Sequence, residues 1–444
     1  MKMRKLVIIF SFLALTIFLL SACNGGSNES VNSYKNDSGS ELLASSETRK
    51  LNPINTESES NLFVSDNNTF ALDLYHAISD KDENLFFSPH SISIAMAMTW
   101  AGAENQTETQ MANTMQFNFV QDKMHSLFNE LDLDLNNRNQ NDPENNDKYL
   151  KLNISNEVWG QKGYPFLEPY LDTLMINYGA GIRLVDFASA PQQARIDINN
   201  WVSEQTENRI EQLLSPNDIT NMTRLVLTNT IYFNATWAIP FDPDKTYDGV
   251  FYLEDGTTVT VPMMIPEAGR GENGEHYAAT DGPDYQAVEL PYYGDEFSMV
   301  IIIPDSGLFG AFEQNLDSSV IDEIVDNLEV QEITLRMPKF ECESRLNLSE
   351  TLSGMGMPDA FAPGVADFSG MDGTLNLFIG KVIHQASITL DEIGTEAAAA
   401  TAVIMELTAV PNRLEITIDR PFLYIIRDNQ TGTILFLGRI KNPT

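Results

Sequence analysis

The residues of this chain that could carry chemistry gather in the segment 391–406, whose composition suits two different conformations. Its five alanines favour a helix by intrinsic propensity. The segment also continues an alternating pattern that begins at Ala386 and is typical of a strand. As a strand it places small and then apolar residues on one face: Thr395, Ala397, Ala399, Thr401, Val403 and Met405. An alanine-rich helix and a strand that slides between two neighbouring strands both fit these residues.

Motifs of common enzyme chemistry are missing from the sequence. The chain has five histidines and two cysteines, and it contains no G-x-S-x-G elbow, H-E-x-x-H pair, P-loop or C-x-x-C pair. We therefore expect no catalytic residues, no metal site and no cofactor, and the chain is not expected to be an enzyme.

The elements that must position the segment are helices and strands without regular βαβ alternation. Helical spacing occurs at residues 68–79, 91–100 and 105–134. Branched and aromatic runs predict strands at residues 150–159, 224–233, 298–304, 414–418, 422–427 and 433–440. This order of elements indicates an α+β fold.

Short motifs from about residue 65 to the end resemble the serpins, a family of serine-protease inhibitors that insert their reactive loop into a sheet as a strand. In the family's order they include Asn84–Ile92, Trp100–Ala103, Asn199–Val202, Leu227–Asn234, Val288–Tyr292, Met337–Phe340, Asp419–Phe422 and Leu435–Ile440. The resemblance implies one α+β domain with three β-sheets, eight or nine helices and an exposed reactive-centre loop. Length alone, at 444 residues, suggests about three domains.

The segment with two possible conformations is similar to the serpin hinge. The resemblance assigns the hinge to Glu392, Gly394, Thr395, Glu396, Ala397, Ala398, Ala399, Ala400 and Thr401. Small residues matter there because Thr395 must be buried first, and a charged side chain would stall insertion through its desolvation cost. Ile393 and Ala235 depart from the family pattern, since a polar residue and glycine are common at these positions.

Two further groups match positions at which the main sheet of serpins opens. A hydrogen-bonding cluster beneath the sheet corresponds to Ser88, Ser91, Asn229 and His384. From the residues alone, His384 is equally well explained as a buried histidine with satisfied partners. A breach at the top of the opening corresponds to Trp237, Lys339 and Glu392, with the last two as a charged pair.

The resemblance implies a suicide-substrate inhibitor of serine proteases. Family spacing counted from Glu392 places the reactive bond at Thr408–Ala409, whereas spacing counted back from Pro421 lands about two residues later. The bonds Leu407–Thr408 and Ala409–Val410 are the alternates. No Lys or Arg lies beside these bonds, so elastase-, subtilisin- or chymotrypsin-like targets are expected. The competing interpretation is a non-inhibitory serpin that acts as a surface-binding or chaperone-like protein.

The charge of the chain limits its partners. The chain has 63 acidic and 27 basic residues and a formal net charge of −36, which disfavours nucleic acid and anionic membrane surfaces. The region 104–123, where some serpins bind heparin-like cofactors, has one basic residue, Lys123. We expect a monomer whose partner is a target serine protease, held in a covalent complex.

The N-terminus has the features of a secretory signal. Basic residues precede an apolar run from Leu6 to Leu20, and small residues follow. Leu20–Cys23 also resembles the lipobox of prokaryotic lipoproteins, and an uncleaved membrane anchor is the alternative. We expect a signal peptide at 1–22, a flexible tether at 23–62 with lipid on Cys23, and a serpin domain at 63–444. The protein would be extracellular and anchored to the cell surface, or alternatively secreted.

Cysteine usage predicts no intrachain disulfide, because Cys23 lies at the processing site. Cys342 lies in a strand-like run and is expected to be a buried free thiol.

Overall fold

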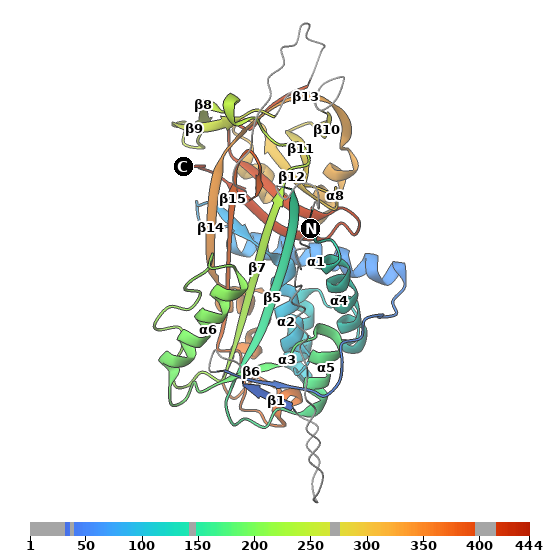
Figure 1. The fold of residues 1–444 in the computed structure, drawn as a ribbon, viewed down its shortest axis with the longest axis vertical. Helices are drawn as coiled ribbons and strands as arrows, with labels where there is room; N and C mark the ends of the chain where they lie inside the picture. The colour runs from blue at the N-terminus through green and yellow to red at the C-terminus, as the bar shows by residue number, and fades with distance from the viewer. Residues whose placement is uncertain (1–31, 36–39, 142–147, 267–275, 396–413) are drawn as a thin grey trace, which may run out of the picture.

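The computed structural model describes residues 32–35, 40–141, 148–266, 276–395 and 414–444. These residues form an α+β fold, as the order of elements predicts (Figure 1). The helices in the described residues are α1 (Glu57–Ile78), α2 (Pro89–Trp100), α3 (Asn105–Met115), α4 (Gln121–Asn136), α5 (Glu168–Tyr178), α6 (Pro191–Gln205), α7 (Phe309–Gln314), α8 (Ser318–Asp326), α9 (Ser349–Met355), α10 (Ser369–Asp372) and the 3-10 helices η1 (Pro243–Lys245) and η2 (Pro358–Phe361). The ten α-helices exceed the eight or nine expected, and helices as short as α9 and α10 are too short to show a hydrophobic period.

The main sheet has nine strands and runs along the length of the molecule (Figure 1). Its spatial order is β1 (Asn32–Lys35), β2 (Glu41–Ala44), β6 (Ile182–Val185), β5 (Tyr149–Gln161), β7 (Leu225–Thr236), β16 (Gly394–Thr395), β15 (Lys381–Leu390) and β14 (Phe340–Asn347). A ninth strand, β4 (Gln140–Asn141), pairs with β5.

The remaining ten strands are continuously hydrogen-bonded, and we divide them into two sheets at the single strand pair that joins them. The first sheet contains β3 (Leu85–Phe87), β19 (Ile434–Ile440), β18 (Phe422–Asp428), β12 (Phe297–Pro304), β11 (Tyr285–Pro291) and β10 (His276–Asp281). The second contains β13 (Glu329–Pro338), β9 (Thr258–Met264), β8 (Tyr247–Tyr252) and β17 (Leu414–Thr417). They meet where β10 pairs with β13. The expectation of three sheets is therefore confirmed.

Helix α2 lies in the interior of the molecule and joins the main sheet to the six-stranded sheet. All twelve of its residues are buried, and it contacts β5, β7 and β19. A helix that is buried on all sides needs apolar or small residues around its whole circumference, and α2 has them. Its N-terminus is capped by Ser88, whose hydroxyl accepts a hydrogen bond from the Ser91 N–H at 3.3 Å.

Helix α6 covers the opposite face of the main sheet near one end (Figure 1). The core beneath it includes Trp201, Ile198 and Val202 from the helix and Trp159 and Val226 from the strands. The main sheet is therefore apolar on both faces at this level, which explains why β7 reads as a nearly continuous buried run.

Strands β7 and β15 pair along only part of their length. Lys381–Gln385 pairs in parallel with Val226–Thr230. Further up, Thr395 of β16 lies between the two strands and pairs with Ala235 of β7 and Leu390 of β15. Within the described residues, Ile231–Asn234 of β7 and Ala386–Thr389 of β15 have no strand partner on their facing edges.

Within the residues it describes, the structure corrects the expected flexible tether at 23–62. Glu41–Leu43 of β2 pairs with β6 at the edge of the main sheet, and α1 begins at Glu57. A four-residue strand whose partner lies about 140 positions away has too little local pattern to be recognised. The start of α1 did carry a signal, because Thr56 and Glu59 form a capping box.

The two ends of the main sheet carry different parts of the chain. Strands β1 and β6 lie at the lower end in Figure 1, and β8, β9 and β13 lie at the upper end. Thr395 pairs with Ala235 near the upper end of β7, and Leu414 pairs with Ile333 of β13. Within the described ranges, no helix is long and apolar enough to cross a membrane.

Cys342 is buried and free, as expected, with burial raising the pKa of its thiol to about 11. Such a thiol is almost entirely protonated at neutral pH and is therefore a poor nucleophile.

Candidate functional site

The site is built around a tight turn that connects β15 to β16. The Asp391 N–H donates to the Gly394 carbonyl at 3.0 Å. The Asp391 carboxylate accepts from the backbone N–H groups of Ile393 at 2.8 Å and Gly394 at 3.2 Å. A side chain at Gly394 would place its Cβ 2.1 Å from the Ala235 carbonyl oxygen, so only glycine lets the returning chain approach β7 this closely.

Thr395 is the first hinge residue that lies between β7 and β15. It is 2% exposed, and its Oγ1 lies 2.8 Å from the Tyr292 hydroxyl. A threonine fits this buried position because its one polar atom has a partner. The side chain of Thr395 is therefore buried with its hydrogen bond satisfied.

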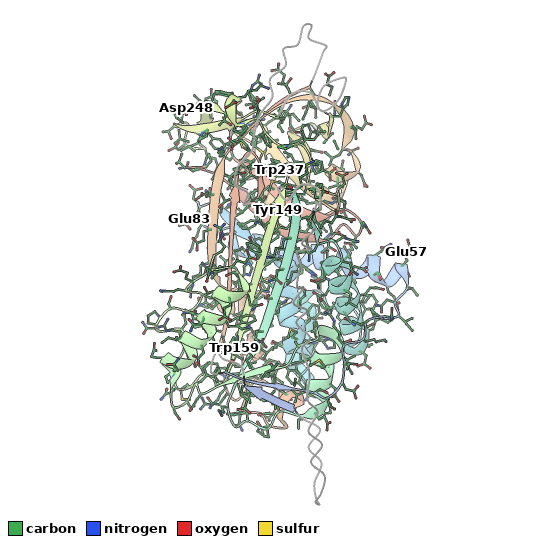
Figure 2. The ribbon with its side chains drawn as sticks, viewed as in Figure 1. Glu57, Glu83, Tyr149, Trp159, Trp237 and Asp248 are labelled. Carbon is green, nitrogen blue, oxygen red and sulfur yellow. The ribbon has the colours of Figure 1, made fainter. Side chains whose placement is uncertain are left out.

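Trp237 holds the turn against the upper end of β7 (Figure 2). Its backbone N–H donates to the Ile393 carbonyl at 2.8 Å, and its indole Nε1–H donates to the Asp391 carbonyl at 3.1 Å. The indole ring also stacks on Tyr292, with ring centroids 4.5 Å apart. One aromatic pair thus supports both the turn and Thr395.

The predicted charged pair is present beside the turn. Lys339 forms an ion pair with Glu392, and the Thr246 hydroxyl donates to the other carboxylate oxygen of Glu392 at 2.6 Å. Burial opposes ionisation of Glu392, but the hydrogen bonds from Lys339 and Thr246 outweigh it, so the pKa of Glu392 lies below its ordinary value. The carboxylate is therefore ionised and fully engaged at neutral pH.

The structure also brings together Ser88, Ser91, Asn229 and His384 beneath the main sheet. The Ser88 N–H donates to Nε2 of His384 at 3.0 Å. Since Nε2 is an acceptor, the ring proton lies on Nδ1, which donates to Oδ1 of Asn229 at 2.6 Å. The Ser91 hydroxyl donates to the same oxygen at 2.6 Å. The cluster thereby ties α2 to β15 and β7.

His384 must be neutral in this arrangement. It is completely buried, and desolvation lowers its pKa to about 3. A second ring proton would also point at the Ser88 N–H and remove that hydrogen bond. Both ring nitrogens of His384 have a hydrogen-bond partner. This agrees with an ordinary buried histidine and also with a member of the predicted cluster.

Three partners in these groups were not identified from the sequence: Tyr292, Thr246 and Asn156. Asn156 on β5 accepts a hydrogen bond from the Asn229 amide and so extends the cluster across β7 to its neighbour. Tyr292 ends one of the family motifs, which was a usable signal. Thr246 and Asn156 had none, because their roles depend on contacts between distant strands.

Several predicted site residues lie outside the described residues. These are the hinge residues Glu396, Ala397, Ala398, Ala399, Ala400 and Thr401, the reactive-bond residues Leu407, Thr408, Ala409 and Val410, and the lipidation residue Cys23.

Comparison with known proteins places this geometry in context. A family model described as "Serpin (serine protease inhibitor)" matches residues 65–443. Among curated proteins, the leukocyte elastase inhibitor of Homo sapiens is 38% identical over 387 residues, covering 85% of this chain and 98% of that protein. An uncharacterized serpin-like protein of Thermococcus kodakarensis is 38% identical over 379 residues, covering 85% of this chain and 84% of that protein.

Solved structures agree with these sequence matches. The native state of tengpin, a thermophilic serpin, superposes with a TM-score of 0.77 at 25% identity, covering 89% of this chain and 98% of tengpin. Thyroxine-binding globulin in complex with thyroxine superposes with a TM-score of 0.75 at 30% identity, covering 86% of this chain and all of that one.

Proposed function

The chain belongs to the serpin family, and we propose from this premise that it is a suicide-substrate inhibitor of serine endopeptidases. The observation that carries the proposal is that, among the residues the structure describes, the facing edges of β7 and β15 directly below Thr395 have no strand partner. The facing edges of two central strands need hydrogen-bond partners, and a strand continuing from Thr395 would supply them.

The proposed reaction begins as ordinary proteolysis. The protease serine attacks the carbonyl carbon of Thr408, the peptide bond to Ala409 breaks, and the amine of Ala409 leaves with a proton. The chain ending at Thr408 is now an ester of the protease. If residues 395–408 insert as a strand, fourteen residues at about 3.4 Å each carry the protease about 48 Å along the sheet.

Trapping then depends on distortion of the bound protease. Hydrolysis of the ester needs a water held in correct geometry, and small displacements of catalytic groups greatly reduce the rate. Insertion must precede that hydrolysis. The buried, hydrogen-bonded position of Thr395 supports fast insertion because the first step is already made in the intact protein.

The target class follows from the loop sequence and from one group of relatives. Residues 407–410 are Leu, Thr, Ala and Val, which suit elastase-, subtilisin- or chymotrypsin-like pockets. Several relatives at 36–38% identity are named leukocyte elastase inhibitor, which supports an elastase-like target.

The test is incubation of the purified protein with pancreatic elastase, subtilisin and chymotrypsin, and with trypsin as the disfavoured comparison. The expected product is an SDS-resistant complex and a released peptide that begins at Ala409 or an adjacent residue. If every protease clips the loop and stays fully active, the protein is a non-inhibitory serpin. Cleavage should also raise the melting temperature, and an unchanged value would contradict insertion.

We also propose that Cys23 carries lipid and anchors the protein outside a prokaryotic cell, with Leu20–Cys23 as the supporting motif. The test is metabolic labelling with a fatty acid in a bacterial host that processes lipoproteins. Label should appear in the wild type and be lost in Cys23→Ser. Equal labelling of both, or of neither, would contradict the anchor.

A further inference from the structure

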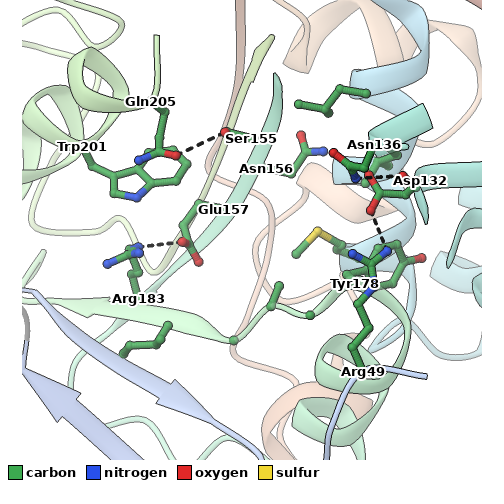
Figure 3. A pocket seen from close by; sticks show the side chains of 17 residues that line it. Arg49, Asp132, Asn136, Ser155, Asn156, Glu157, Tyr178, Arg183, Trp201 and Gln205 are labelled. Carbon is green, nitrogen blue, oxygen red and sulfur yellow. Dashed lines mark hydrogen bonds and ion pairs between the residues drawn. The ribbon is translucent and has the colours of Figure 1, made fainter. Parts of the chain in front are cut away.

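A cavity of about 310 Å³ lies beside the main sheet, away from the hinge and its turn. Its walls come from β5, α2, α4, α6 and the stretch from Tyr178 at the end of α5 to Arg183 in β6, and Leu42 of β2 and Arg49 also line it (Figure 3). Its volume falls at the lower end of the range for small-molecule sites.

The charged groups of the cavity compensate one another. Nε of Arg183 donates to Oε2 of Glu157 at 2.6 Å, and Nη2 of Arg49 donates to Oδ2 of Asp132 at 2.5 Å (Figure 3). With Glu157 ionised, two arginines and two acids are paired, and an added ion would bring a charge without a counter-charge. In this charge state the cavity favours a neutral occupant.

One acceptor in the cavity wall is unsatisfied. Glu157 is 8% exposed, and its Oε1 is buried without a hydrogen-bond partner in the described residues. Burial, only partly opposed by Arg183, raises the pKa of Glu157 to about 7, so both protonation states are populated near neutral pH. A hydroxyl group serves both states, because it donates to a carboxylate oxygen and accepts from a carboxylic acid.

Other side chains in the wall are polar but neutral. Asn136, Asn156, Ser155 and Gln205 all line the cavity. Amides and hydroxyls can donate and accept, so they match a ligand with several hydroxyl groups. Trp201, together with Ile94 and Met98, adds apolar surface on which the carbon skeleton of such a ligand would rest.

We propose that this cavity is a binding site for a small neutral polyhydroxy compound, a polyol or monosaccharide, with Glu157 as its principal hydrogen-bonding residue. Asn156 belongs both to the cavity wall and to the hydrogen-bonded cluster around Asn229. An occupant that engages Asn156 would therefore stabilise the cluster with β5 and β7 in their present positions.

The test is a titration of the whole protein with xylitol and with myo-inositol, followed by tryptophan fluorescence and by melting temperature. A specific site gives a saturable response, since stabilisation by a bound ligand follows the occupancy of the site. General exclusion of a polyol from the protein surface instead gives a response that increases without saturation. Putrescine is titrated in parallel as a cationic probe.

Two variants and one control separate the outcomes. Glu157→Gln keeps an oxygen for Arg183 and turns the free acceptor into an amide donor, so polyol binding should weaken by about tenfold or more. Ala180→Leu adds bulk at the cavity wall and should abolish the saturable response. Glu341→Gln, at an exposed position on β14, should bind as the wild type does.

A response that does not saturate overturns the proposal, as does saturable binding that both variants retain. Saturation by putrescine alone overturns the neutral class of ligand. A second consequence rests on the proposed inhibitory function: saturating polyol should slow formation of the SDS-resistant complex in the wild type and not in Glu157→Gln. Absence of any complex without polyol would refute the inhibitory function, whereas absence of saturable binding would refute the site.

Discussion

The hydroxyl of Tyr292 and Oγ1 of Thr395 lie 2.8 Å apart, and both side chains are buried at the upper end of the gap between β7 and β15. Thr395, the first buried residue of the proposed hinge, is thus fixed to the body of the protein by a hydrogen bond that is shielded from solvent. Tyr292 is itself held by its stacking on Trp237.

Replacing Thr395 by Arg should convert the inhibitor into a substrate. An arginine cannot be buried between β7 and β15, in the position where Thr395 is 2% exposed, without losing its hydration. The number of inhibitor molecules consumed per protease trapped should rise at least about tenfold, measured by titration of elastase activity. Thr109→Arg, at an exposed position on α3, is the charge-matched control. Unchanged trapping by Thr395→Arg would contradict the hinge assignment.

A double-mutant cycle should measure the hydrogen bond between Tyr292 and Thr395. Tyr292→Phe and Thr395→Val each remove one hydroxyl while keeping the shape of the side chain. Each should lower the free energy of unfolding by about 1 kcal/mol, with a coupling of about 0.5–1.5 kcal/mol in denaturant unfolding. Tyr252→Phe, at a position 53% exposed, serves as the control for losing a phenol. Additive effects would show that the contact is not energetically significant.

Acid should destabilise the protein through its buried histidines. The folded-state pKa of His384 is about 3 and that of His90 about 4, both depressed by burial, whereas an unfolded histidine titrates near pH 6.5. Below pH 6.5 the unfolded state binds more protons, so stability is present at neutral pH and is lost as the pH falls toward 3.

The variant His384→Gln isolates one of these contributions. It should cost about 1–3 kcal/mol at pH 7 because hydrogen bonds of the cluster are disturbed. It should also reduce the acid slope of the free energy of unfolding by up to about 1.4 kcal/mol per pH unit. Urea unfolding between pH 4 and 7 measures both effects, with the exposed residue change His276→Gln as the control. A slope equal to that of the wild type would contradict a neutral buried His384.

Replacing Gly181 by Ala should displace the N-terminal strand from the sheet. The added Cβ would lie 2.5 Å from the Leu43 carbonyl oxygen, which is closer than a carbon atom can approach. Hydrogen exchange should show lost protection at Leu42 and Leu43, with a stability cost on the order of 1 kcal/mol. Gly310→Ala, where the new Cβ meets no atom within 4 Å, is the control. Retained protection of Leu42 and Leu43 would show that β2 does not depend on this contact.

The body of the fold was predictable because its elements carry strong local patterns. The strands predicted at 150–159, 224–233 and 298–304 agree within a few residues with β5, β7 and β12. Each is a long run rich in β-branched residues, which is a strong local signal for a strand. The pair Lys339 and Glu392 was predictable only through the family resemblance, because no local pattern joins positions 339 and 392.

The order of the described residues between 40 and 62 could not be predicted from local sequence patterns. Polar and small residues dominate 24–62, and such composition usually indicates disorder. Yet Arg49 bonds to Asn129 and Asp132, and the Asn129 amide donates to the Lys50 carbonyl at 2.6 Å. Polar contacts of this kind order a segment without apolar periodicity, and their partners on α4 lie about 80 positions away.

The position of β1 has a consequence for how a lipid-anchored molecule would work at a bilayer. Only residues 24–31 would separate Cys23 from β1, a span of at most about 28 Å when fully extended. Strand β1 lies at the end of the sheet toward which a captured protease would travel (Figure 1). The diameter of a globular enzyme of ordinary size exceeds the length of this linker. The bound protease would then be in steric contact with the lipid surface, so that the host membrane itself would add to its distortion.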